Sequence, residues 1–228
     1  MILAIDTSTD QGSLALLANA SVVAELSWSV RGNHSRHLPQ ALETVLQLEG
    51  AHLEDVKGIA VASGPGSFSG IRVGMSAAKG LALALDVPLV GVATLDILGF
   101  QGCHVSPAVC AVIGAGRGEI FAARYRGSPS RFDLAEPYTI TTTKDLVRAL
   151  ERSEIVIGPA SGEILEALGD DEAARHACPG AMQLRRAGFL AELGRRHLDA
   201  GRQTELDSLE PIYLRKSAAE EKRANQKE

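Results

Sequence analysis

The chain has 228 residues, of which 45% are hydrophobic but only 4% aromatic, and its formal net charge is −5 at pH 7. This length allows one large domain or two small ones, with a core built mainly from Ala, Leu, Val and Ile. The acidic balance excludes general electrostatic attraction to a nucleic acid, so any such contact would need a local patch or a partner protein.

The cysteines and the N-terminal residues predict a cytoplasmic protein. Cys103, Cys110 and Cys178 form no CxxC pair and lack the spacing of a metal site, and scattered cysteines in odd number are typical of a reducing compartment. Asp6 and Asp10 interrupt the apolar start, which therefore does not resemble a secretory signal. No apolar run approaches the length of a membrane span, and we expect no contact with a membrane.

The chain begins with a predicted buried strand that ends in polar side chains, Met1-Ile-Leu-Ala-Ile-Asp6-Thr-Ser-Thr9. Strands are then expected over residues 13–18 and 21–28. They flank Asn19-Ala20, which is a weaker turn signal than Asn-Gly but still predicts a β-hairpin.

A helix is expected over residues 35–49, because apolar residues recur at helical spacing: Leu38, Ala41, Leu42, Val45 and Leu46. His34 and His37 lie three residues apart at its start and could share one face. A metal site needs three or four ligands, and Glu43 is the nearest further candidate, so surface or capping histidines are favoured over a metal site.

A glycine-rich turn is the most informative feature of the chain. The strand expected at 58–63 leads into Ser63-Gly-Pro-Gly-Ser-Phe-Ser-Gly-Ile-Arg-Val-Gly74, and a helix follows over 70–85. Exposed backbone N–H groups and the positive end of the helix dipole meet at such a turn. A phosphate could bind there, and two backbones could equally pack closely.

Three known phosphate or nucleophile motifs do not fit this turn. A Walker A loop needs a Lys directly after Gly70, and a nucleophile elbow needs a Ser at the position of Phe68. A dinucleotide fingerprint lacks its third glycine, and Asp86 precedes the next strand, expected over 88–93, instead of ending it. A turn that only reverses the chain is therefore the alternative to a phosphate site.

The helix expected over 70–85 is apolar on almost every side, which predicts that it is central in its domain or buried by another chain. Gly70 and Gly74 lie four residues apart and would allow close approach of another backbone. Arg72 and Lys79 are either solvent-facing charges or polar contacts within an interface.

The second half begins after Gly99. A strand pair is expected around Gly116-Arg117, followed by a surface turn, a capped helix, a buried strand and a long helix. These elements are expected at residues 107–115 and 118–125, 127–131, 143–150, 154–158 and 182–200. Residues 216–228 have the composition of a disordered tail, and no internal repeat is evident.

Five sequence blocks occur in the order found in one family: Ile5-Asp-Thr-Ser8, His34-Ser-Arg-His-Leu-Pro39, Ser63 to Gly74, Gly118-Glu-Ile-Phe121 and Pro211-Ile-Tyr-Leu-Arg215. Together they resemble the TsaB family, formerly YeaZ, over residues 1–215. The strand–Asp–Thr–hairpin opening before a glycine-rich turn is also similar to the actin, sugar-kinase and Hsp70 superfold.

The resemblance implies an α/β fold of two actin-like, ribonuclease H-like (ASKHA) lobes with mixed sheets flanked by helices. We expect the lobes at 1–98 and 99–215, with the last helix packing back on the first lobe. The family implies a non-catalytic scaffold that pairs with a TsaD-type threonylcarbamoyltransferase. With a TsaE-type ATPase and TsaC-made threonylcarbamoyl-adenylate, the pair would modify adenosine 37 of ANN-decoding tRNAs.

The expected partner surface lies on the two helices of the first lobe: His34, Leu38, Leu42, Arg72, Val73, Met75, Ala78, Lys79 and Ala82. The chain alone would pair with itself through the same helices, and tRNA would be reached through the complex. Replacing Ala78 with Glu is expected to abolish binding to the TsaD-type subunit and to leave the fold intact.

Comparison with the catalytic paralogue TsaD implies that this chain has no catalytic residue and no metal centre. TsaD carries two metal-binding histidines where this chain has Thr94 and Leu98, and Leu cannot bind a metal. ATP and a metal are therefore expected on the partner subunits, and no cofactor is expected here. The turn residues Gly64, Gly66, Ser67 and Gly70 would be a vestigial phosphate loop.

Two positions depart from the related patterns. Asp6-Thr-Ser-Thr9 lacks the glycine of the superfold's Asp-x-Gly-Thr, so Asp6 is more readily a turn cap than a catalytic acid. Relatives usually read Asp-Ala-Arg where this chain reads Gly114-Ala-Gly116-Arg117.

Two other functions remain open. One is a small kinase or ATPase that uses Asp6 and the turn from Gly64 to Gly70, which titration of the chain with ATP and Mg²⁺ would detect. The other is a peptidase, for which no Ser-His-Asp order with an elbow is visible.

Overall fold

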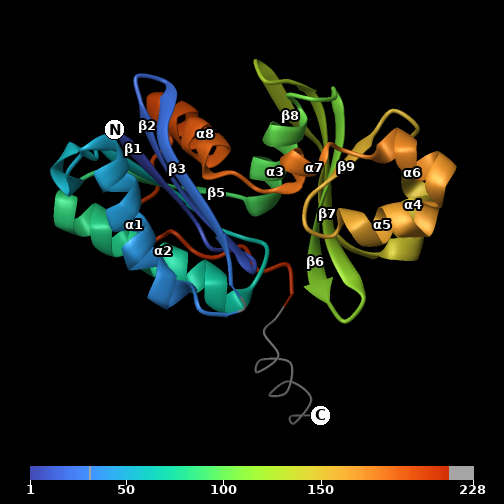
Figure 1. Ribbon diagram of the computed structural model, residues 1–228, viewed down its shortest axis with the longest axis horizontal. Coiled ribbons are helices and arrows are strands. Elements are labelled where there is room, and N and C mark those ends of the chain that lie inside the picture. The colour runs from blue at the N-terminus through green and yellow to red at the C-terminus, as the bar shows by residue number, and fades with distance from the viewer. Residues whose placement is uncertain (31, 216–228) are drawn as a thin grey trace, which may run out of the picture.

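The computed structural model describes residues 1–30 and 32–215, so the tail expected over 216–228 lies outside the described residues. The chain forms two α/β halves that lie side by side, each built on one mixed β-sheet (Figure 1). The expected fold class is therefore confirmed.

The first sheet has five strands in the order β3-β2-β1-β4-β5. Strands β1 to β3 are antiparallel, and β1, β4 and β5 are parallel. Asn19 and Ala20 both have positive φ, as a two-residue hairpin turn requires, and the expected hairpin forms. The strands are β1 (Ile2–Asp6), β2 (Gln11–Ala18), β3 (Ser21–Ser29), β4 (Gly58–Ala62) and β5 (Leu89–Val92).

Helices cover both faces of this sheet. Helices α1 (His34–Glu49) and α2 (Phe68–Leu85) pack on one face, where they meet large side chains such as Leu3 and Ile5. Helix α8 (Ala187–Asp199) packs on the other face, against Ala4 and Ala60. It approaches so closely that a Cβ on Gly194 would lie 2.4 Å from that of Ala60. The alternation of large residues and alanines along β1 and β4 follows from this difference between the faces.

The second sheet has four strands in the order β8-β7-β6-β9, which repeats the order of the first four strands of sheet one. In both sheets three antiparallel strands are followed by a parallel strand, and the first sheet has β5 as a second parallel strand. The repeat lies in the topology and was not evident in the sequence. The strands are β6 (Ala108–Gly116), β7 (Glu119–Ser128), β8 (Arg131–Thr142) and β9 (Ile155–Ile157).

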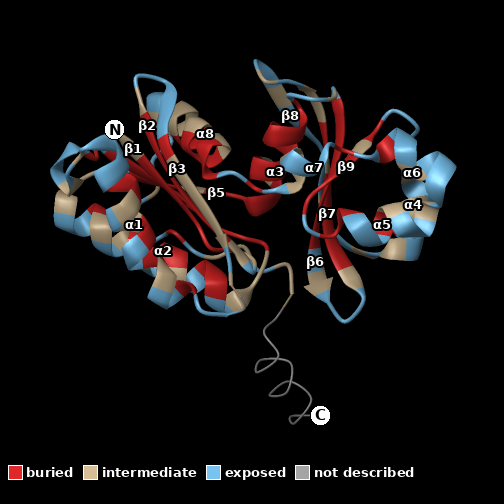
Figure 2. Cartoon of the chain, in the orientation of Figure 1, coloured by how far each residue is buried: buried red, intermediate tan, exposed pale blue. Residues whose placement is uncertain are grey.

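Helix α3 (Thr94–Gly102) lies between the two sheets and packs on β6 and β7, whereas α4, α5 and α6 cover the outer face of the second sheet (Figures 1 and 2). These outer helices bury only one side each. Their bounds are α4 (Thr143–Ala149), α5 (Ser161–Leu168) and α6 (Asp170–His176), and a short 3₁₀ turn, η1 (Leu53–Asp55), precedes β4.

The prediction of one continuous helix over residues 182–200 is wrong, because the helix is interrupted. Helix α7 (Gly180–Gln183) ends before residues 184–186, and α8 starts only at Ala187. Arg186 has the extended angles φ −106° and ψ 128°. We call residues 184–186 the α7–α8 linker. Arg185 in this linker is buried.

Helix α2 was expected to be central in its domain or buried by another chain, and within this chain it is buried on one side only. Its inner face, with Ile71, Met75 and Ala78, is buried in the chain's own core, whereas Gly80 and Leu83 are exposed. Its N-cap is Ser67, whose side chain accepts a hydrogen bond from the Gly70 N–H at 3.3 Å. In residues 1–30 and 32–215, no helix is both long and apolar enough to cross a membrane.

Candidate functional site

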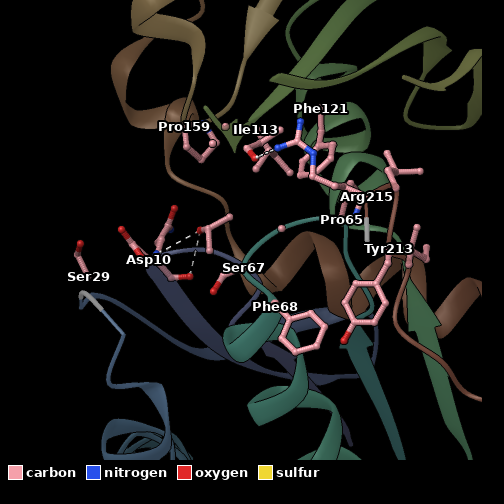
Figure 3. A pocket seen from close by; sticks show the side chains of 18 of the residues that line it. Asp10, Ser29, Pro65, Ser67, Phe68, Ile113, Phe121, Pro159, Tyr213 and Arg215 are labelled. Atoms are coloured by element: carbon pink, nitrogen blue, oxygen red, sulfur yellow. Dashed lines mark hydrogen bonds between the residues drawn. The ribbon is translucent and has the colours of Figure 1, made fainter. Parts of the chain in front are cut away.

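A cleft of about 820 Å³ lies between the two halves (Figure 3). One wall consists of the hairpin start, residues 9–11, and the glycine-rich turn at 65–68. The facing wall comes from residues 113–116 and Phe121 of the second sheet. The polypeptide that follows α8 closes one side with residues 212–215.

Three of the five family blocks meet through hydrogen bonds at the first wall. The Thr7 hydroxyl donates to the Gly70 carbonyl oxygen at 2.7 Å, and the Ser67 N–H donates to the Ser8 carbonyl oxygen at 2.7 Å. Nε2 of His34, in the second block, lies 2.6 Å from the Thr9 carbonyl oxygen. The blocks are thus a single packed unit, and His34 is a buried residue of this unit.

The remaining two blocks meet on the other side of the cleft. The Ile212 N–H donates to the Ser63 carbonyl oxygen at 2.7 Å, which places the last block beside the glycine-rich turn. Arg215 forms an ion pair with Glu119, and its guanidinium donates to the Ala115 carbonyl oxygen at 3.1 Å. The C-terminal segment therefore bridges the two halves.

The glycines of the turn serve close packing of backbones. A Cβ on Gly66 would lie 2.0 Å from the Ser8 carbonyl oxygen, and one on Gly70 would lie 2.2 Å from the Thr7 carbonyl oxygen. Both distances are far below a normal contact, and Gly66 also has a φ of 159°. The turn is therefore packed against the residues that follow β1, and its residues 65–68 still line the cleft.

Asp6 is buried at the end of β1, and its carboxylate is fully engaged. It accepts hydrogen bonds from the N–H and the hydroxyl of Ser8, at 2.9 and 2.7 Å. It also forms an ion pair with Arg185, whose Nε donates to one oxygen and whose Nη2 donates to the other at 3.2 Å. Both oxygens thus have protein partners, which favours the interpretation of Asp6 as a structural residue.

Arg185 is the site residue that the sequence interpretation missed. It lies in the α7–α8 linker, 179 residues from Asp6. One signal was available, because two adjacent arginines near the start of α8 are unfavourable at the positive end of a helix dipole. Such a pair indicates that the side chains have partners elsewhere, but the pattern does not identify them.

Three glutamine side chains hold the segment around this linker. Gln11 pairs with the backbone of Arg185, donating to its carbonyl oxygen at 2.8 Å and accepting from its N–H at 3.2 Å. Gln101, which is buried, donates to the carbonyl oxygens of Met182 and Leu184 at 2.6 and 2.9 Å. Gln183 accepts from the Gly158 N–H at 2.9 Å. The segment is therefore fixed to both halves of the molecule.

A second polar cluster lies behind the cleft, where α3 meets the second sheet. Asp96 accepts hydrogen bonds from the hydroxyls of Tyr125 and Tyr138, both at 2.8 Å. Burial raises the pKa of Asp96 above its ordinary value of 3.8, although these hydrogen bonds and the nearby His197 act in the opposite direction. The cluster links α3 to β7 and β8 and does not line the cleft.

His34, His37 and Glu43, the residues considered as metal ligands, form no metal site among the described residues. In residues 1–30 and 32–215, no group of three or more His, Cys, Asp or Glu side chains is placed to hold a metal ion. Thr94 and Leu98 are both buried on α3, where Leu98 packs in the core of the second half.

The residues expected to contact a partner fall into two groups. Five are buried in the chain's own core and present no surface: His34, Leu38, Met75, Ala78 and Ala82. Leu42, Val73 and Lys79 are partly exposed, and Arg72 is exposed. The expectation that Ala78→Glu would leave the fold intact is therefore wrong, because Ala78 is 0% exposed and a buried carboxylate there would disrupt the core.

Helices α1 and α2 nevertheless present an apolar outer face. A groove of about 320 Å³ runs between them and is lined by Pro39, Leu42, Ala77 and Leu81, among others. Leu83 beside it is 72% exposed, which is high for so large an apolar side chain. We call this surface the α1–α2 face.

Arg72 marks the end of this face that is nearest the cleft. Its guanidinium lies 3.8 Å from the centre of the Phe68 ring, and its Nε donates to the Tyr213 hydroxyl at 3.1 Å. Phe68 and Tyr213 also stack, with ring centres 4.9 Å apart. Arg72 thus belongs to a cluster within the chain that ties the start of α2 to the C-terminal segment.

The fold and the cleft define an actin-like α/β protein of two related halves. An activator of 2-hydroxyisocaproyl-CoA dehydratase from Clostridium difficile, solved with bound ADPNP, shares this fold with a TM-score of 0.52 and 13% identity over 93% of this chain and 98% of that one. Residues 28–223 match the family model described as "TsaD: tRNA N6-adenosine threonylcarbamoyltransferase".

Within this class, the chain belongs to the TsaB (YeaZ) family. It is 30% identical to the tRNA threonylcarbamoyladenosine biosynthesis protein TsaB of Escherichia coli over 96% of both chains. It is 36% identical to the Bacillus subtilis TsaB protein over 55% of both. YeaZ from Pseudomonas aeruginosa has the same fold, with a TM-score of 0.77 and 24% identity over 93% of this chain and 99% of that one.

Proposed function

We propose that this chain is a non-catalytic scaffold subunit in the synthesis of threonylcarbamoyladenosine at position 37 of ANN-decoding tRNAs. The observation that carries the proposal is the similarity to Escherichia coli TsaB along almost the whole chain. In this proposal the chain binds and stabilises a TsaD-type threonylcarbamoyltransferase. A TsaE-type ATPase and tRNA join through the complex, and ATP and the metal bind to the partner subunits.

Three features support a non-catalytic role. The carboxylate of Asp6 is fully engaged by Ser8 and Arg185. The glycine-rich turn is packed against the Thr7–Ser8 backbone. Thr94 and Leu98 stand where the resemblance places the histidines of TsaD. A small ATPase would need an accessible Asp6, and Asp6 is 0% exposed, so we do not favour this alternative.

The α1–α2 face is our proposed contact with the TsaD-type subunit. Leu42 and Leu81 line its groove, and Leu83 projects from α2 into solvent, so a partner helix could cover apolar surface without any change in the core. In the absence of the partner, a second copy of the chain would cover the same face, which predicts a homodimer.

Co-purification with a TsaD-type subunit tests this proposal. Leu83→Glu replaces an exposed side chain by another good helix former, so the fold should persist while partner binding is reduced at least tenfold. Leu134→Glu is the matched control, because Leu134 is also exposed, at 45%, but lies on β8 of the other half. Normal binding by Leu83→Glu, or loss of binding by both variants, would refute the proposed surface.

A further inference from the structure

We propose that the guanidinium of Arg185 takes the place of a divalent cation in front of Asp6, and that it thereby makes this carboxylate unavailable to a metal-bound nucleotide. The proposal goes beyond the scaffold function and does not depend on any partner. In kinases of the superfold, an acid at the first hairpin orients a Mg²⁺ ion or a water molecule. In this chain the acid at that place, Asp6, forms an ion pair with Arg185.

The Asp6 carboxylate already has several hydrogen-bond partners. Oδ1 of Asp6 is approached by the Ser8 N–H, the Ser8 hydroxyl and Nη2 of Arg185, while Oδ2 accepts from Nε of Arg185. A Mg²⁺ ion needs an oxygen ligand at about 2.0–2.1 Å and several retained waters in octahedral geometry. Both oxygens already have donors, so a Mg²⁺ ion bound to this carboxylate would have to displace or crowd the guanidinium.

The ion pair between Asp6 and Arg185 is buried. The side chains of Asp6 and Arg185 are each 1% exposed, so solvent does not screen them. Their charges neutralise each other, and a buried charge is tolerated when it is paired and hydrogen-bonded. A divalent cation beside the guanidinium would add like charge in a medium of low dielectric, which is strongly unfavourable.

Further hydrogen bonds hold Arg185 in place. Gln11 holds both backbone hydrogen-bonding groups of Arg185. The same guanidinium donates to the Thr9 hydroxyl at 3.1 Å and to the Gln11 carbonyl oxygen at 3.3 Å. The Arg186 N–H next to it donates to the Gln101 side chain at 3.2 Å. The cation is therefore built into the linker and held at the end of β1.

The arrangement has a mechanical consequence. Asp6 belongs to the central strand of the first sheet, whereas the α7–α8 linker is where the chain returns from the second half. The ion pair thus holds the α7–α8 linker, where the chain returns from the second half, against the end of β1 in the first half. We infer that the interlobe geometry is held by this internal cation and does not respond to metal or nucleotide.

The direct test uses the whole wild-type chain and needs no partner. We expect its melting temperature to be unchanged, within 1 °C or so, by millimolar MgCl₂ or MnCl₂ with or without ATP. We also expect no binding of Mn²⁺ or of Mg·ATP in calorimetric titration at micromolar concentrations. Micromolar binding of either, or a clear rise in melting temperature, would overturn the proposal.

Substitutions test the role of the ion pair. Arg185→Gln leaves Asp6 buried without its partner and should lower the melting temperature by roughly 6–20 °C. Arg186→Gln is the matched control: the neighbouring arginine pairs with Glu25 at the surface, where its side chain is 52% exposed, and its loss should shift melting by only about 0–4 °C.

The double variant Asp6→Asn/Arg185→Gln removes both charges and should recover most of the loss caused by Arg185→Gln. Equal melting of the Arg185→Gln and Arg186→Gln variants would contradict the proposal, and so would a double variant no better than Arg185→Gln. If Arg185→Gln does not fold at all, the wild-type titration still decides. Failure of the partner-binding test leaves these measurements unaffected, so the two proposals fail separately.

Discussion

A substitution of Gly70 distinguishes a packing role of the glycine-rich turn from a phosphate-binding role. Gly70 lies in the first turn of α2, where a Cβ would come within 2.2 Å of the Thr7 carbonyl oxygen. The Thr7 hydroxyl and the Ser67 N–H hold the two segments together, so neither can withdraw without loss of a hydrogen bond. We therefore expect Gly70→Ala to destabilise the fold even without a ligand.

The magnitude follows from three effects. Alanine in place of glycine favours a helix by about 1 kcal/mol. Overpacking a rigid contact costs about 1–3 kcal/mol. In the variant the hydrogen bond from the Thr7 hydroxyl to the Gly70 carbonyl oxygen would also be weakened, which adds about 1 kcal/mol to the cost. The net loss is about 1–3 kcal/mol, or roughly 2–12 °C in melting temperature for a chain of this size.

Gly80→Ala is the control within the same helix. No atom lies within 4 Å of a Cβ at Gly80, so only the helix preference acts, and melting should rise by roughly 1–4 °C. Circular dichroism melts of the two variants should therefore shift in opposite directions. If Gly70→Ala also raised the melting temperature, the turn would not be close-packed, and its glycines would have to serve a ligand.

Three further predictions concern the buried groups. Asp96→Asn should raise stability at pH 7. The pKa of Asp96 in the folded protein lies above 3.8, so ionisation of this carboxyl weakens the fold as the pH rises from about 4. In thermal melts the gain over wild type should therefore vanish below about pH 4. Burial raises the pKa of Cys103 to about 11 and that of Cys110 to about 12, so a thiol reagent at pH 8 should label the native protein at least a hundredfold more slowly than the unfolded chain. Leu209→Ala should cost about 2–4 kcal/mol in denaturant unfolding and speed proteolysis of the C-terminal segment, since Leu209 is buried against Gly91; unchanged stability would show that the segment does not fasten the cleft.

The first half of the fold could be predicted because its signals are local. The strand at Gly58–Ala62 is a short apolar run between polar residues, and the α1 stripe repeats at helical spacing. Both elements lie within one or two residues of the predicted bounds. The glycine-rich turn between β4 and α2 was likewise located correctly, since glycine and proline mark turns strongly.

The elements that were missed lack such signals. Strand β8 is a mostly exposed edge strand with Pro137 in its middle, so it shows neither a buried run nor a regular alternation. Helix α3 is buried along nearly its whole length between the sheets, and its apolar residues therefore show no single face.

The site depends on contacts that no local pattern encodes. The apolar periodicity continues across residues 182–200, whereas the helix breaks where Arg185 pairs with Asp6, 179 residues away, and where glutamine side chains bind the backbone of the linker. The burial of α2 could not be predicted for a similar reason. Its sequence is apolar on almost every side, so the pattern does not show that Ala78 is buried and Leu83 exposed. Which side of an apolar helix faces the core is decided by the strands it packs on.

The most direct test of the scaffold proposal is reconstituted tRNA modification with a TsaD-type subunit, a TsaE-type ATPase and threonylcarbamoyl-adenylate, with and without this chain. We predict that omission of the chain abolishes most of the activity, that Leu83→Glu lowers it in proportion to lost binding, and that a saturating concentration of this variant restores the full rate. Full activity without the chain, or a rate that stays low when Leu83→Glu saturates its partner, would contradict a role limited to binding and stabilisation.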